Sequence, residues 1–172
     1  MLENDAALQM ADEIRQDRKQ AESMLLNYAE ELKTYRLKRE EYVRGNNVQG
    51  GGGNLPGHPT EADALRGVKF DETYPAYTWL RAVEFVERGL SERKRIFLDA
   101  RRKASRDKTG RGRRAWLVRT QMMYCEAMRE RFLNTEFFTS ERVLKDMWRY
   151  IVDRTVEAYL KLEQNKLNRR VP

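Results

Sequence analysis

The sequence predicts an all-α protein in which a long N-terminal helix precedes a helical C-terminal domain. Residues 4–44 contain neither proline nor glycine, so nothing in them interrupts a helix. Charged residues make up 35% of the chain and hydrophobic residues 40%, which allows a helical core beneath a hydrated surface. Glycine gathers in one stretch, GGGGNLPGHPTEADAL at residues 50–65. We therefore expect a coiled-coil-like oligomerisation helix at 1–44, a glycine- and proline-rich hinge at 45–60 and a helical DNA-binding domain at 61–172.

The long helix carries a narrow apolar stripe whose intervals alternate between three and four residues, as in a heptad repeat. Its members are Ala7, Ala11, Ile14, Ala21, Leu25, Tyr28, Leu32, Tyr35 and Tyr42. Arg18 and Arg39 interrupt the stripe, and Gly45 with Asn46 is expected to end the helix. Self-association through residues 7–42 would bury the stripe, and packing against the chain's own C-terminal helices is the alternative. We favour self-association for the N-terminal half of the helix.

The glycine stretch is interpreted as a connection and not as a phosphate-binding loop. A phosphate loop needs a Lys-Ser/Thr pair at the start of the following helix, whereas here the carboxylates of Glu61 and Asp63 would repel a phosphate. Four consecutive glycines predict a flexible hinge, and Pro56 and Pro59 predict a turn with fixed backbone angles. Thr60 followed by Asp63 resembles a capping box, so a short helix should begin there.

Four helices with apolar faces are expected in the rest of the domain. The first begins at Pro75 and carries Trp79, Val83, Val86 and Leu90, and the second is capped by Ser91 and carries Ile96, Phe97 and Ala100. The third begins near Ala115 and carries Trp116, Met122, Met123, Met128 and Phe132. The last is capped by Thr139 or Ser140 and carries Leu144, Met147, Ile151, Thr155, Ala158 and Leu162.

The positive charge of the chain is concentrated in one segment. The net charge is +7, yet residues 1–44 hold eight basic and ten acidic side chains. Residues 91–114, by contrast, hold eleven basic and three acidic side chains. A basic segment this dense predicts a polyanionic partner, and double-stranded DNA is the simplest one. A solvated helix face that is merely basic is the alternative.

Several function classes find no support in the residues. No apolar run approaches the length of a membrane span, so we expect a cytoplasmic protein without membrane contact. The single cysteine, Cys125, is expected to be a small buried residue, and the single histidine, His58, is expected to serve turn geometry. Most carboxylates stand beside Lys or Arg at helical spacing, which is typical of solvated ion pairs. We therefore expect no enzyme activity, no cofactor and no metal site.

Three segments resemble one protein family. The tract GGG-x-N-L-P-G-x-P-T follows a helix rich in Glu, Lys and Tyr, and WLRAVEFVERGLSERKR (79–95) and FTSERVLKDMWRYIVDRTVEAYLKL (138–162) follow in order. Together they resemble the RinA family of phage late-gene transcriptional activators, which is related to the ArpU-type regulators. The resemblance covers roughly residues 25–165, and the glycine-proline tract is its most distinctive part. It implies a sigma-region-4-like helix-turn-helix unit whose recognition helix is the last helix of the chain.

The resemblance and the charge together predict a homo-oligomeric activator of late transcription in the cytoplasm of a bacterial host. Two copies double the length of a recognised site and fix its spacing. Contact with host RNA polymerase is also expected, because activation requires it. The side chains expected to contact phosphates in the basic segment are Arg101, Arg102, Lys103, Arg106, Lys108, Arg111, Arg113 and Arg114. On the last helix we expect Arg142 and Lys145 at base edges, Arg149 on the same side and Ser140 at a phosphate.

Two other functions stay open. A small terminase subunit also binds DNA and oligomerises, but it forms large closed rings. A structural adaptor would bind a partner helix through the long helix, and its basic segment would only confer solubility. RNA is a less suitable ligand, since the aromatic residues fall on apolar helix faces and form no exposed stacking array.

Overall fold

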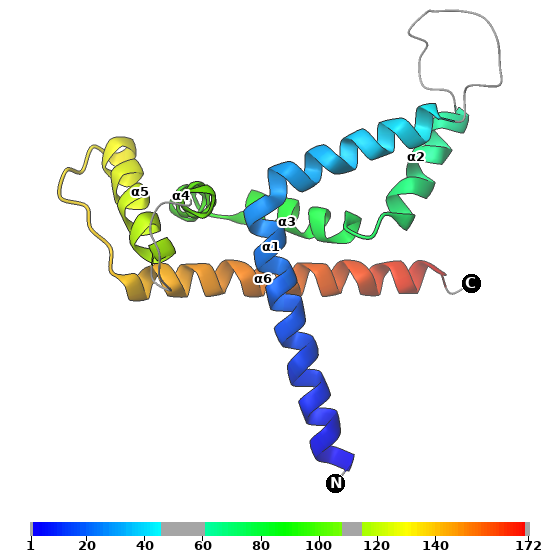
Figure 1. Cartoon of the computed structure of the whole chain (residues 1–172), viewed down its shortest axis with the longest axis horizontal. Coiled ribbons are helices and arrows are strands. Elements are labelled where there is room, and N and C mark those ends of the chain that lie inside the picture. Colours follow the sequence, from blue (N-terminus) through cyan, green and yellow to red (C-terminus); the bar gives the residue numbers. More distant parts are fainter. Residues whose placement is uncertain (1, 46–60, 108–114, 171–172) are drawn as a thin grey trace, which may run out of the picture.

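The chain is a six-helix assembly in the computed structural model, which describes residues 2–45, 61–107 and 115–170 and the side chains between residues 8 and 168 of these ranges (Figure 1). The helices are α1 (Leu2–Arg44), α2 (Glu61–Thr73), α3 (Tyr77–Gly89), α4 (Glu92–Arg106), α5 (Ala115–Phe132) and α6 (Glu141–Arg170). No strand occurs in these ranges, so the all-α prediction is confirmed. Most of the predicted hinge, residues 46–60 with His58 and Thr60, lies outside the described residues.

Helix α6 is the element on which the others assemble. It contacts α1, α3, α4 and α5, while α2 packs on α1 and α3. Figure 1 shows α1 crossing α6 and bending near that crossing, with α4 and α5 at the start of α6 and α3 running beside its later turns. The C-terminal part of α1 and α2 form an arm that ends above α3.

The two halves of α1 have different surroundings. Every described residue from 8 to 16 is exposed, and Figure 1 shows this N-terminal part extending beyond α6. From Arg18 onward α1 packs on its own chain, and Ala21, Met24 and Leu25 are buried in a core that they share with α3 to α6. Within-chain packing, the alternative to self-association, therefore accounts for the later part of the stripe.

The two arginines that interrupt the stripe mark the places where α1 meets acidic groups of other helices. Arg18 forms an ion pair with Asp153 of α6 at 2.7 Å, and Arg39 forms one with Asp71 of α2 at 2.8 Å. Both pairs lie on the side of α1 that faces its own chain. A stripe with charged residues opposite acidic partners is a docking surface for specific helices and not a uniform coiled-coil seam.

A buried glycine lies where α1 and α2 meet. A Cβ at Gly67 of α2 would contact the flexible end of the Arg39 side chain, which would have to shift to make room. The Tyr35 hydroxyl donates to Asp71, and its ring contacts those of Phe70 and Tyr74. The arm is thus held by an aromatic cluster around one carboxylate. Helix α1 ends at Arg44, which confirms the stop predicted at Gly45, and the Gly45 amide makes the last helical bond, to the Glu41 carbonyl at 2.7 Å.

The core confirms most of the predicted apolar faces. Its largest fully buried side chains are Phe97, Leu25, Leu98, Leu117, Met128, Leu144, Ile151, Val83 and Val152. Cys125 is buried, as expected. Two predicted core residues of α5 are exposed, Met122 at 67% and Phe132 at 42%, because α5 packs mainly on α4 and turns these residues outward. Pro75 also differs from its predicted first-turn position, because α3 begins at Tyr77.

Candidate nucleic-acid interface

The basic segment forms α4 and continues into residues 108–114, which lie outside the described residues. Phe97, Ala100 and Ala104 face the core, so the basic side chains of α4 divide between buried and exposed positions. The division falls within three consecutive residues, Arg101 to Lys103. It decides which cations a polyanion could reach.

Arg101 points into the core. The residue is 9% exposed, and its guanidinium lies 4.1 Å from the ring centroid of Trp116 and 5.1 Å from that of Trp148. Burial lowers the pKa of Arg101 to about 10, against a smaller opposing effect of Glu22. Its buried Nε atom has no hydrogen-bond partner among the described residues. The guanidinium therefore joins α4, α5 and α6 through cation–π contacts.

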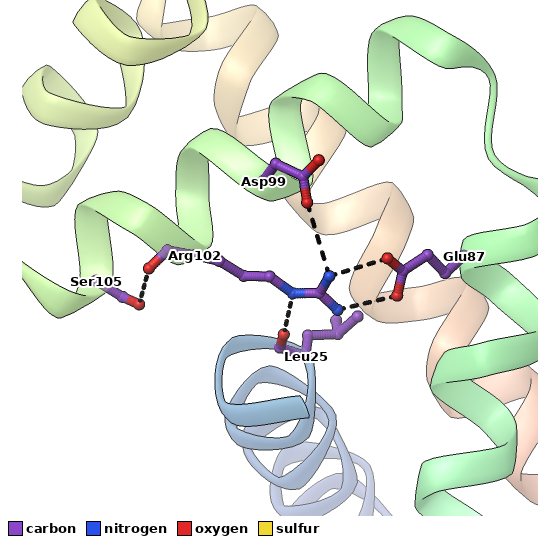
Figure 2. Close-up of polar contacts among 5 residues, drawn as sticks. All are labelled: Leu25, Glu87, Asp99, Arg102 and Ser105. Atoms are coloured by element: carbon purple, nitrogen blue, oxygen red, sulfur yellow. Dashed lines mark hydrogen bonds and ion pairs between the residues drawn. The ribbon is translucent and has the colours of Figure 1, made fainter. Parts of the chain in front are cut away.

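Arg102 connects α4 to α3 and α1 (Figure 2). Its two terminal nitrogens donate to the two carboxylate oxygens of Glu87 at 2.9 and 3.0 Å. Its Nε donates to the backbone carbonyl of Leu25 at 2.8 Å, and Asp99 lies 3.8 Å away. The guanidinium also faces the ring of Tyr28. The planar guanidinium group of arginine is well suited to donate to both oxygens of a carboxylate at once.

These placements narrow the predicted phosphate contacts. Arg101 and Arg102 hold helices together, so we remove both from the set of residues proposed to contact DNA. Lys103 and Arg106 are exposed on α4 and form no ion pair within the described part of the chain. The other four predicted contacts, Lys108, Arg111, Arg113 and Arg114, fall in the segment that the structure does not describe.

The predicted residues of α6 lie on its outer face. Ser140 accepts a hydrogen bond from the Val143 amide at 3.4 Å, so it caps α6 as predicted and its hydroxyl is engaged locally. Arg142 is exposed. Lys145 lies 3.8 Å from Glu141, and Arg149 lies 3.4 Å from Asp146; both pairs are solvent-exposed and therefore weak.

The connection between α5 and α6 differs from that of a simple helix-turn-helix. It comprises residues 133–140, whereas the motif has a turn of three or four residues. The segment runs back along α5, since Arg129 donates to the Phe137 carbonyl at 3.0 Å and Gln121 to the Thr139 carbonyl at 2.6 Å. Leu133, with a φ of 51°, begins the reversal.

The cations at the N-terminal end of α4 were not among the predicted phosphate contacts. Lys94 lies 3.9 Å from the ring centroid of Tyr150, and Arg93 lies 5.6 Å from that of Phe132. Arg95 donates to the Arg88 carbonyl at 3.0 Å. The ERKR run was counted in the basic segment, but only the three-dimensional structure brings it beside aromatic rings of α5 and α6.

No candidate metal centre was found: among the described residues, no three His, Cys, Asp or Glu side chains group closely enough to hold an ion. None of the helices in the described ranges has both the length and the apolar content needed to cross a bilayer. Comparison with known proteins finds no matching family model, no similar curated protein and no similar solved structure.

Proposed function

We propose that the protein is a DNA-binding activator of phage late transcription that works as a homo-oligomer. The main support for this proposal is that the basic residues of α4 have two different roles. Arg101 and Arg102 fix the helix in the fold. Lys103 and Arg106 project from it, pair with no carboxylate in the described ranges, and are followed by a further basic run. A rigidly held helix with outward cations is suited to phosphate contacts.

The resemblance to the RinA family adds the biological context and the expectation that the last helix reads bases. Arg142 is the best base-reading candidate on α6, because it is exposed and forms no ion pair within the described residues. The sigma-region-4-like unit stays a prediction. Self-association is proposed for the N-terminal part of α1, since the later part packs on its own chain.

The phosphate contacts are tested by measuring DNA affinity against salt. The Lys103→Ala/Arg106→Ala variant should bind every duplex more weakly than the wild type. Each lost phosphate contact lowers the slope of log K against log salt by about 0.9, so the slope should fall by up to about 1.8. Fluorescence anisotropy with a labelled duplex at several salt concentrations measures both quantities.

A matched variant controls for the general loss of charge. Lys33→Ala/Lys69→Ala also removes two exposed cations, but from α1 and α2. It should lower the slope far less. Equal slopes in the two variants would mean that α4 has no privileged contact with DNA.

Recovery of bound fragments from the phage genome separates the activator from the terminase. Enrichment upstream of packaging and structural genes supports activation, whereas enrichment within a packaging-start sequence supports a small terminase subunit. Retention of no fragment at moderate salt would contradict both and favour the adaptor.

A further inference from the structure

We propose that copies of this chain associate head to tail, with the exposed N-terminal part of α1 of one copy seated in a cationic, aromatic groove between α3 and α6 of the next. The two surfaces are called the rod, residues 8–16, and the groove, which is formed by the last turn of α3 and the middle of α6. This arrangement rests on the self-association proposed above for the N-terminal part of α1 and adds the surface on the next copy that receives it.

The rod is an acidic amphipathic helix on which no described part of its own chain packs closely enough to bury a residue. Met10 and Ile14 lie one turn apart on one face and are 64% and 52% exposed. The rod itself carries Asp12 and Glu13 against Arg15, and the residues before it add Glu3 and Asp5 and no Lys or Arg. Within the described residues, Asp12 pairs with Arg15 of the same helix, and both side chains are exposed. Such a helix supplies two apolar anchors and an acidic rim to a partner.

The groove has the complementary character. It has a volume of about 450 Å³ and is lined by Phe85, Val86, Arg88 and Gly89 of α3, by Leu90 directly after α3, and by Tyr150 and Arg154 of α6. Phe85 is 66% and Tyr150 45% exposed, so aromatic surface lies open on its walls. A Cβ at Gly89 would meet nothing within 4 Å, which leaves room above the backbone for a second helix.

The rim of the groove carries excess positive charge. Glu84 is shared by Arg81 and Arg88 at 2.6 Å each, and Glu157 is likewise shared by Arg154 and Lys161. Each carboxylate therefore neutralises only one of its two cations.

The start of α4 adds further positive charge to the rim. Lys94 lies over Tyr150, and Arg95 is bonded to a backbone carbonyl and not to a carboxylate. Acidic residues of an incoming helix would find these cations around the aromatic anchor sites.

The two surfaces differ from each other, so the contact is heterologous. Each copy has one rod and one groove, and repeated contacts of this kind give a closed ring or an open filament. A pairing of two rods would instead be isologous and would stop at a dimer. This difference makes the proposal testable by complementation.

The experiment uses two variants of the full chain, each with one surface disabled. The rod variant is Met10→Glu/Ile14→Glu, and the groove variant is Phe85→Ser/Arg88→Glu. All four positions are exposed, and circular dichroism melting should confirm that both variants fold like the wild type. Each variant alone should self-associate at least about tenfold more weakly than the wild type in sedimentation without DNA.

A mixture of the two variants is the decisive measurement. The intact groove of one and the intact rod of the other should form a one-to-one complex that cannot grow. The proposal is overturned if the mixture stays monomeric, if the groove variant associates like the wild type, or if the wild type itself is monomeric. A groove variant that loses DNA affinity but not association would assign the groove to nucleic acid instead. DNA binding by the monomeric rod variant tests the phosphate contacts separately.

Discussion

The two halves of α1 have similar residue types, but the later half packs in the core and the N-terminal half is exposed. Ile14 and Leu25 belong to the same apolar stripe of one helix, yet Ile14 is 52% exposed and Leu25 is fully buried. The heptad stripe runs through both halves without a change of period. What differs is the availability of partners, since α3, α4 and α6 surround the middle of α1 whereas the rod extends beyond them.

The spacing of apolar residues in a sequence therefore defines which face of a helix is apolar, but it does not define which partner covers that face. In the packed half, Arg18 forms an ion pair with Asp153 and Arg39 forms one with Asp71. The ring nitrogen of Trp148 also donates to Glu22 at 3.2 Å. These polar contacts across helices fix which neighbours α1 takes. The rod has no such contact within the described part of its own chain.

The largest effect should come from truncating the buried leucine. Leu25→Ala removes a fully buried side chain from the junction of α1 with the core and should lower the free energy of unfolding by about 2–5 kcal/mol. Leu8→Ala removes the same atoms from an exposed site and should change it by less than about 0.5 kcal/mol. Urea unfolding of both variants measures the difference. Similar losses in the two variants would contradict the division of α1.

A smaller loss in the free energy of unfolding should follow from removing the polar contacts of Arg102, which hold the packed half of α1. Arg102→Met removes the bidentate pair with Glu87 and the donor to the Leu25 carbonyl. The free energy of unfolding should fall by about 2 kcal/mol, because the Glu87 carboxylate would remain in a partly buried place without its bidentate donor. Lys103→Met is the matched control and should be nearly neutral, since Lys103 is exposed. Should the two variants unfold at the same urea concentration, the link contributes nothing measurable.

Sequence patterns predicted the helices and most inward faces because both depend on local period. The faces with Trp79 and Val83 on α3 and with Leu144 and Ile151 on α6 are confirmed as buried. Periodicity failed for Met122, which is 67% exposed, because α5 has more apolar residues than its neighbours can cover.

The roles of the basic residues could not be predicted in the same way. Arg101, Arg102 and Lys103 are adjacent in sequence and similar in chemistry, so composition assigns them one role. Helical geometry turns them about 100° apart, so they face two indole rings, a carboxylate of α3 and solvent, respectively. The groove was missed for the same reason, since its walls come from segments at least sixty residues apart in the sequence.

The smallest effect concerns the far end of the packed half, where Tyr35 donates to Asp71 at 2.5 Å. Burial raises the pKa of Tyr35 well above its ordinary value of 10, and the bond to Asp71 raises it further. Above pH 10 the unfolded chain therefore loses this proton while the folded chain keeps it, so stability falls as the pH rises. Tyr35→Phe should cost about 1 kcal/mol at neutral pH.

The same substitution should also make the alkaline loss of stability shallower, by up to about 1.4 kcal/mol per pH unit. Urea unfolding between pH 8 and about pH 11 measures this slope. Tyr42→Phe is the control, because Tyr42 lies on the same helix but its hydroxyl makes no hydrogen bond within the described residues. An unchanged slope in Tyr35→Phe would show that the phenol ionises as easily in the folded chain as in the unfolded one. The arm would then be held by its aromatic contacts and by the ion pair between Arg39 and Asp71.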